Sequence, residues 1–184
     1  MSNPIELPEL CLPFLRAAMK PYLEKLPKEL ESAMKGATCE AMQKAPAGKW
    51  NSAQIVEHLY LTYTNTNKGI AKCMDGGVAL ATRATVKHRV KSFVVTRLGY
   101  LPEGAKAPER AVPRGMPLEE VREKLFGEIR RMAAGLDDCE RRFGAGTKIM
   151  DHPILGPLTA NEWRRFHWLH GRLHARQIRQ RLKL

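Results

Sequence analysis

Paired cysteines, long apolar runs and an export signal are all missing from this sequence. Its cysteines are scattered and form no CxxC motif; they are Cys11, Cys39, Cys73 and Cys139. Such spacing argues against a disulfide framework or a zinc ribbon and favours reduced thiols. No apolar run approaches the ~18 residues of a membrane-spanning helix, and the first residues lack the basic start and apolar stretch of a signal peptide. We therefore expect a cytoplasmic protein with no membrane partner.

Internal repeats and low-complexity segments are absent as well. The 184 residues are 43% hydrophobic and 27% charged, which is ordinary for a soluble globular chain. A chain of this length can bury one complete core. We expect a single domain over residues 1–184.

Acidic residues are too few to balance the basic ones, so the formal net charge is +12. A basic stripe can bind nucleic acid, acidic lipid or an anionic substrate. Nucleic acid is not the partner we expect, because aromatic residues are not interleaved with the basic ones and no DNA-reading motif is present. We prefer a solvated outer face for the last helix. Its Arg-rich face around Trp168 is also typical of a subunit interface, and comprises Arg164, Arg165, Arg172 and Arg179.

Apolar residues at three- and four-residue spacing predict helices over most of the chain. The predicted helices span residues 9–20, 27–44, 51–73, 78–98 and 117–143, and a last one follows Thr159. Two of them have the sequence of a capping box at their start, formed by Asn51 with Gln54 and by Thr159 with Glu162. Residues 101–116 form a loop whose length favours an active-site border or a lid, and residues 144–158 form a second loop.

The last predicted helix carries three of the six histidines, His167, His170 and His174. At about 100° of turn per residue, all three share one face. His170 and His174 are four residues apart, which brings two imidazoles within reach of one ion. His167 with His170 is the competing pair, and ordinary core packing of all three is the alternative to metal binding.

A fourth histidine, His58, points inward from a different predicted helix. The neighbouring Glu57 lies about 100° further around this helix. We interpret it as a surface carboxylate, and its position at the flank of the helix leaves a catalytic base as the alternative. His152 precedes the last helix in the second loop, and we expect it to pack that loop rather than bind a metal. His58, His170 and His174 together would supply three neutral nitrogen ligands and leave coordination positions open, as in catalytic zinc sites.

Three stretches, Trp50 to Leu59, His152 to Thr159 and Glu162 to Gln177, make the chain similar to a known family. It resembles the DinB/YfiT-like superfamily of metal-dependent helical-bundle proteins, over roughly residues 25–184. The middle stretch, with the pattern HPxxGxLT, resembles an uncharacterised subgroup, a domain of unknown function. The resemblance implies an all-α fold, a four-helix bundle with extra short helices, and a homodimer. It also implies that the metal ligands are His58, His170 and His174.

The same resemblance implies an enzyme that binds a divalent metal, zinc or nickel, and a small-molecule substrate. The open metal position would activate a low-molecular-weight thiol or water, for thiol transfer or hydrolysis. The competing hypothesis is a non-enzymatic, stress-related binding protein, or one associated with nucleic acid, in which the metal is structural or absent. The sequence gives no catalytic residue beyond the metal ligands.

Overall fold

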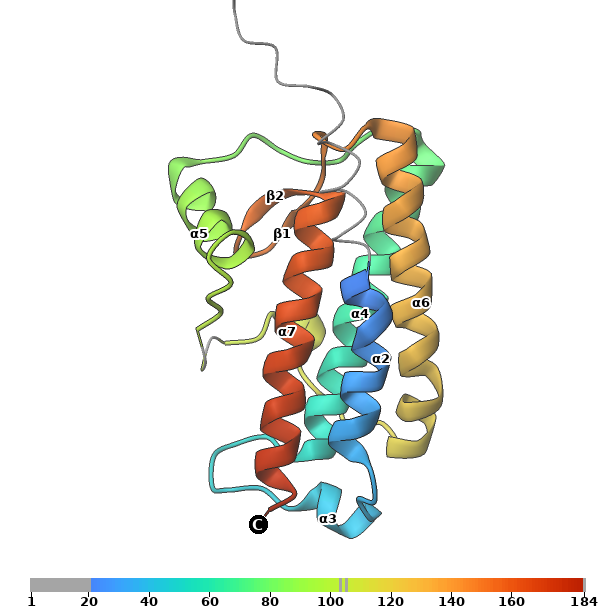
Figure 1. The fold of residues 1–184 in the computed structure, drawn as a ribbon, viewed down its shortest axis with the longest axis vertical. Coiled ribbons are helices and arrows are strands. Elements are labelled where there is room, and N and C mark those ends of the chain that lie inside the picture. Colours follow the sequence, from blue (N-terminus) through green and yellow to red (C-terminus); the bar gives the residue numbers. More distant parts are fainter. Residues whose placement is uncertain (1–20, 103, 105, 184) are drawn as a thin grey trace, which may run out of the picture.

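A computed structural model describes residues 21–102, 104 and 106–183 (Figure 1). The helices are α2 (Pro21–Met34), α3 (Cys39–Gln43), α4 (Ser52–Gly76), α5 (Val86–Thr96), α6 (Leu118–Phe143) and α7 (Ala160–Arg181). A 3-10 helix, η1, spans Glu109–Ala111, and strands β1 and β2 span Lys148–His152 and Gly156–Thr159. The chain is mostly helical, as predicted, and also contains this small two-stranded sheet, which the sequence did not predict. The helix predicted at 9–20 lies outside the described residues.

The four longer helices α2, α4, α6 and α7 lie side by side and pack against one another (Figure 1). Helix α4 packs along α6, α2 packs against α7 and α6, and α7 also contacts α4 and α6. Three- and four-residue spacing predicts an apolar stripe on α6 that begins at Leu118 and ends at Phe143, and these two residues are partly buried against the core. The other six are buried in the core that all four helices share; they are Val121, Leu125, Ile129, Met132, Leu136 and Cys139. The apolar spacing of α6 therefore identified its inner face correctly.

Both predicted capping boxes are confirmed. At the start of α4, Asn51 Oδ1 accepts the Gln54 amide at 2.8 Å and Gln54 Oε1 accepts the Asn51 amide at 3.0 Å. At the start of α7, Thr159 Oγ1 accepts the Glu162 amide at 3.2 Å and Glu162 Oε2 accepts the Thr159 amide at 2.8 Å. These reciprocal bonds satisfy two amides that a helix start otherwise leaves unpaired, and they fix where the histidine-bearing helices begin.

Two predicted helices are shorter than expected. The helix predicted over 27–44 is two helices, because α2 ends at Met34, Gly36 has a left-handed φ of 73°, and Thr38 caps the separate helix α3. The helix predicted over 78–98 begins only at Val86, after the cap Thr85. The apolar spacing of this segment predicts an inner stripe of Val86, Val90, Phe93 or Val94, and Leu98. Val86, Val90, Phe93 and Leu98 are instead exposed, Val86 by 78%, and the helix buries Ser92, Val95 and Thr96. Apolar spacing alone did not distinguish the inner face from the outer one.

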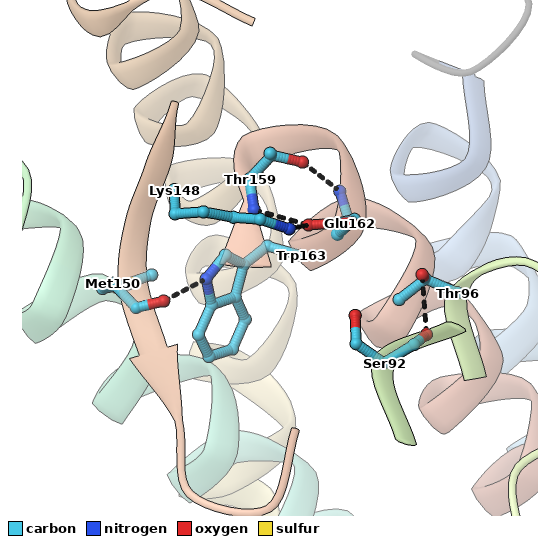
Figure 2. A network of polar contacts seen from close by, with 7 residues as sticks. All are labelled: Ser92, Thr96, Lys148, Met150, Thr159, Glu162 and Trp163. Atoms are coloured by element: carbon cyan, nitrogen blue, oxygen red, sulfur yellow. Dashed lines mark hydrogen bonds and ion pairs between the residues drawn. The ribbon is translucent and has the colours of Figure 1, made fainter. Parts of the chain in front are cut away.

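The loop predicted over 144–158 contains an antiparallel hairpin formed by β1 and β2. The hairpin is joined to the start of α7, as Figure 2 shows. The Trp163 indole donates to the Met150 carbonyl at 3.4 Å, and Lys148 pairs with Glu162 of the capping box. The hairpin therefore anchors the N-terminal end of the helix that carries three of the histidines.

Among the described helices, none combines the length and the apolar character that crossing a membrane requires.

Candidate metal centre

Helices α4 and α7 bring His58, His170 and His174 together, as predicted. His58 lies in the second turn of α4, whose start the Asn51 cap fixes, and Trp50 packs its ring against His58 with centroids 5.1 Å apart. His170 and His174 occupy successive turns of α7. His58 and His174 are buried, whereas His170 keeps some exposed surface. The centre therefore lies between two helices and has access to solvent at His170.

The three imidazoles converge through their Nε2 atoms. His170 Nε2 lies 3.2 Å from His58 Nε2 and 3.0 Å from His174 Nε2. All three ligand atoms lie within 4.8 Å of one another. Tetrahedral coordination with metal–nitrogen distances of about 2.0–2.1 Å separates the nitrogens by roughly 3.3 Å. The two distances to His170 Nε2 are close to this value, so the three histidines could bind one metal ion.

The Nδ1 atoms of two of these histidines are held by hydrogen bonds. His58 Nδ1 donates to the Ala111 carbonyl at 2.7 Å, and His174 Nδ1 donates to the Gln177 side-chain oxygen at 2.8 Å. Both acceptors are oxygens that cannot donate, so each Nδ1 carries the proton and each Nε2 presents a lone pair. Metal-binding histidines are oriented by this kind of bond.

Burial keeps the three imidazoles neutral. It lowers the pKa of His58, lowers that of His174 to about 3, and lowers that of His170 well below its usual range. For His170, repulsion from the charged forms of His174 and His58 adds to the effect. A metal ion requires the unprotonated nitrogen, so protons compete weakly for these ligands at neutral pH. The buried His170 Nδ1 has no hydrogen-bond partner among the described residues.

The interpretation of Glu57 as a surface carboxylate is wrong. Its side chain is buried, with 2% exposed, and it accepts the amides of Arg114, Gly115 and Met116 at 2.6, 3.1 and 3.2 Å. These residues follow η1, whose Ala111 carbonyl contacts His58. The segment 109–116, the last part of the loop predicted over 101–116, therefore borders the histidine cluster.

His167 and His152 lie outside the cluster. His167 is fully buried, contacts the Thr66 hydroxyl through Nε2 at 3.1 Å, and stacks on Trp163 with ring centroids 5.5 Å apart. His152 Nδ1 accepts the amides of Ile154 and Leu155 at 3.1 and 3.2 Å. The expected role of His152 in packing the loop is confirmed, and His167 is a core residue of the last helix.

The basic face predicted around Trp168 is largely used within the chain. Arg164 is buried and pairs with Asp137 and Glu140 at 2.6 and 2.7 Å, and Arg179 pairs with Glu29 at 2.8 Å. The remaining two are engaged less tightly: Arg172 covers the Trp168 ring at 5.4 Å, and Arg165 donates to the Arg97 carbonyl at 3.0 Å. The prediction of a solvated face is wrong for Arg164, and these contacts offer no support for a nucleic-acid surface.

Sequence reasoning missed the Ala111 carbonyl and Gln177, which hydrogen-bond to the cluster, and the loop contacts of Glu57. Gln177 was within reach of the sequence, because it follows His174 by three residues, a spacing that brings helical side chains into contact. The other two depend on where a loop far along the chain returns. A hollow of about 400 Å³ between α2 and α6 contains none of the histidines; Lys28, Glu31, Arg122 and Phe126 are among the residues that line it.

The family of the chain follows from comparison with known families. Residues 25–181 match the family model described as a protein of unknown function, DUF1569. The chain belongs to this family, in agreement with the predicted domain of unknown function. No curated protein and no solved structure matches the chain. The family description assigns no activity, so the function has to be argued from the site.

Proposed function

We propose that this protein is a metal-dependent enzyme with a four-helix bundle of the DinB/YfiT-like type, formed by α2, α4, α6 and α7. The packing of these helices and the position of the histidines on α4 and α7 support the proposal. Bundles commonly build metal sites from side chains on facing helices. The proposed ligands are Nε2 of His58, His170 and His174.

One observation is the main support for a bound metal ion. His58 and His174 each present a lone pair toward His170, and the single Nε2 proton that a neutral His170 can carry satisfies only one of them. Because the imidazoles are buried and neutral, a second proton is costly there. A cation bound by all three nitrogens removes this conflict. Three neutral imidazole ligands suit zinc or nickel, which are the ions we propose.

Three protein ligands leave a coordination position for substrate or water, as in catalytic rather than structural zinc sites. When bound, such an ion lowers the pKa of water toward about 7 or stabilises a thiolate. The chain's own groups orient the ligands, because Ala111 and Gln177 hold His58 and His174, and His170 is only partly buried. We propose transfer to or from a low-molecular-weight thiol, or hydrolysis.

The deciding experiment is elemental analysis of untagged protein, with His58→Ala and His170→Ala variants. We expect near-stoichiometric zinc or nickel in the wild type and its loss in both variants. His152→Ala is the matched control, because His152 is another buried histidine but does not join the cluster; it should keep its metal. A wild-type protein that cannot be loaded with either ion would refute the proposal. Metal-loaded protein would then be assayed for thiol transfer and hydrolysis, with His170→Ala as the blank.

The homodimer and the cytoplasmic location remain predictions. A native mass measurement on the metal-loaded protein tests the first of them.

A further inference from the structure

Glu57 and His58 are neighbours on α4, and both bind the segment 109–116. The buried Glu57 carboxylate accepts three consecutive backbone amides, from Arg114, Gly115 and Met116. A carboxylate forms stronger hydrogen bonds with amides than a neutral acceptor does. Glu57 therefore joins one end of the segment to the helix through several bonds at once.

Two further side chains of α4 bind the other end of the same segment. His58 Nδ1 donates to the Ala111 carbonyl at 2.7 Å, and Asn65 Nδ2 donates to the Arg110 carbonyl at 3.0 Å. The segment runs antiparallel to α4, because its residue numbers rise from Asn65 toward Glu57. The carbonyls of Arg110 and Ala111 accept hydrogen bonds from α4, and the backbone amides of residues 114–116 donate to Glu57. The contact to His58 is thus one of three linked attachments.

We propose that Glu57 is a positioning residue that fixes the segment 109–116 as a permanent wall of the histidine cluster and thereby sets the orientation and tautomer of His58. This inference rests on the proposed metal site. The Ala111 carbonyl keeps the proton on His58 Nδ1, which leaves Nε2 free as a ligand. Without Glu57, the backbone amides of residues 114–116 lose their acceptor, and the Ala111 carbonyl that contacts His58 is no longer held in place. The segment is therefore a fixed border rather than a lid.

The test compares Glu57→Gln with Glu128→Gln, both measured for zinc affinity by competition with a chelating dye. Glu128 is the matched control. Its carboxylate is mostly buried and accepts a hydrogen bond from the side-chain Nδ2 of Asn67 at 2.7 Å, but it lies on α6 and not on α4. We expect Glu57→Gln to lower zinc affinity by about 10- to 100-fold, the usual effect of losing a group that orients a ligand. Glu128→Gln should change it by less than about threefold, and Glu57→Asp, which keeps the charge, should restore part of the affinity.

Hydrogen exchange and the imidazole NMR signals of His58 give readouts that do not depend on the metal. In the wild type, the amides of residues 114–116 should be protected and His58 should carry its proton on Nδ1. In Glu57→Gln both features should be lost, while the α4 and α6 amides stay protected. If Glu57→Gln does not fold, Asn65→Ala, which releases the other end of the segment, should lower zinc affinity in the same direction.

Three results would overturn the inference. Unprotected amides at 114–116 in the wild type would show a mobile lid. Lost protection with unchanged zinc affinity would show that the wall does not position His58. An equal loss of affinity in Glu128→Gln would show a general effect of stability. A wild type that binds no zinc refutes the proposed function instead, and the exchange and tautomer measurements still decide whether Glu57 fixes the wall.

Discussion

The Nε2 atoms of His170 and His174 lie 3.0 Å apart, one helical turn from each other on α7. The His174 nitrogen carries a lone pair, because its Nδ1 proton is donated to Gln177. The Nε2 proton of a neutral His170 can lie between these two nitrogens, but it then cannot also serve the His58 lone pair, which lies 3.2 Å from His170 Nε2. Since burial disfavours an extra proton there, the metal-free cluster leaves one lone pair unsatisfied, a cost that a metal ion bound by all three nitrogens would remove.

Metal binding should stabilise the folded chain. A ligand that binds only the folded state at 100 times its Kd adds about 2.7 kcal/mol to the free energy of unfolding. For a domain of this size we expect zinc to raise Tm by roughly 5–10 °C, as measured by scanning calorimetry with and without a chelator. His170→Ala should show no such increase. A zinc-dependent rise of equal size in His170→Ala would place the ion elsewhere.

The buried ion pairs of Arg164 join α6 to α7. Only 4% of the Arg164 side chain is exposed, and removing it leaves Asp137 and Glu140 without their shared cation. We expect Arg164→Ala to lower the free energy of unfolding by about 3 kcal/mol. This is the lower end of the usual cost of breaking a buried ion pair, because Asp137 is partly exposed. Arg141→Ala is the control, since Arg141 pairs with Asp138 on the surface of α6; its cost should stay below about 1 kcal/mol. Urea denaturation measures both, and equal losses would contradict the argument.

Local signals in the sequence predicted local features well. The capping boxes at Asn51 and Thr159 needed only residues three apart, and both are present in the structure. The pair His170 and His174 shares a face because helical geometry fixes the spacing. Spacing alone left His167 with His170 as an alternative, and only the position of His58 on α4 selects between them.

Features that depend on tertiary packing were not predictable from spacing. Helix α5 has an apolar stripe, yet Val86, Val90 and Phe93 are exposed while Ser92 and Thr96 are buried. Helical spacing puts Glu57 at the flank of α4, but a loop more than 50 residues further along the chain covers it. The hairpin at 148–159 lacked a strong alternating pattern, and its strand β1 contacts Trp163 of α7. In each case, contacts with a segment distant in the sequence determine which residues are buried.

Gly171 gives α7 its close approach to α2 and α4. A Cβ atom at this position would lie 2.4 Å from Leu26 Cδ1 and 3.0 Å from the Tyr63 hydroxyl, both of which are fully buried. We therefore expect Gly171→Ala to lower the free energy of unfolding by about 1–3 kcal/mol through overpacking. Gly127→Ala in α6 is the matched control, since a Cβ atom added there would have no other atom within 4 Å; it should raise stability by roughly 0.5–1 kcal/mol. Chemical denaturation of both variants tests this, and a stabilised Gly171→Ala would show that the helices can separate without cost.

Two buried histidines outside the cluster should make the metal-free protein sensitive to acid. Burial lowers the pKa of His152 to about 4 and that of His167 to about 3. In the unfolded chain both titrate near 6.5, so below that pH the unfolded state binds protons that the folded state does not. The contribution of these two histidines to the free energy of unfolding is therefore fully present above about pH 6.5. It falls as the pH decreases, by at most about 1.4 kcal/mol per pH unit for each histidine, until the pH reaches the pKa of that histidine in the folded state.

His152→Asn and His167→Gln remove one titrating group each and keep a hydrogen-bonding atom near Nδ1 of His152 and Nε2 of His167. Urea denaturation of chelator-treated protein between pH 7 and pH 4.5 measures the slope of the free energy of unfolding against pH. In each variant the slope should be smaller than in the wild type by roughly the contribution of one proton, about 1.4 kcal/mol per pH unit at most. This holds even where the variant is less stable than the wild type at pH 7. A variant with the full wild-type slope would show that its histidine already takes up a proton in the folded state near pH 6.5.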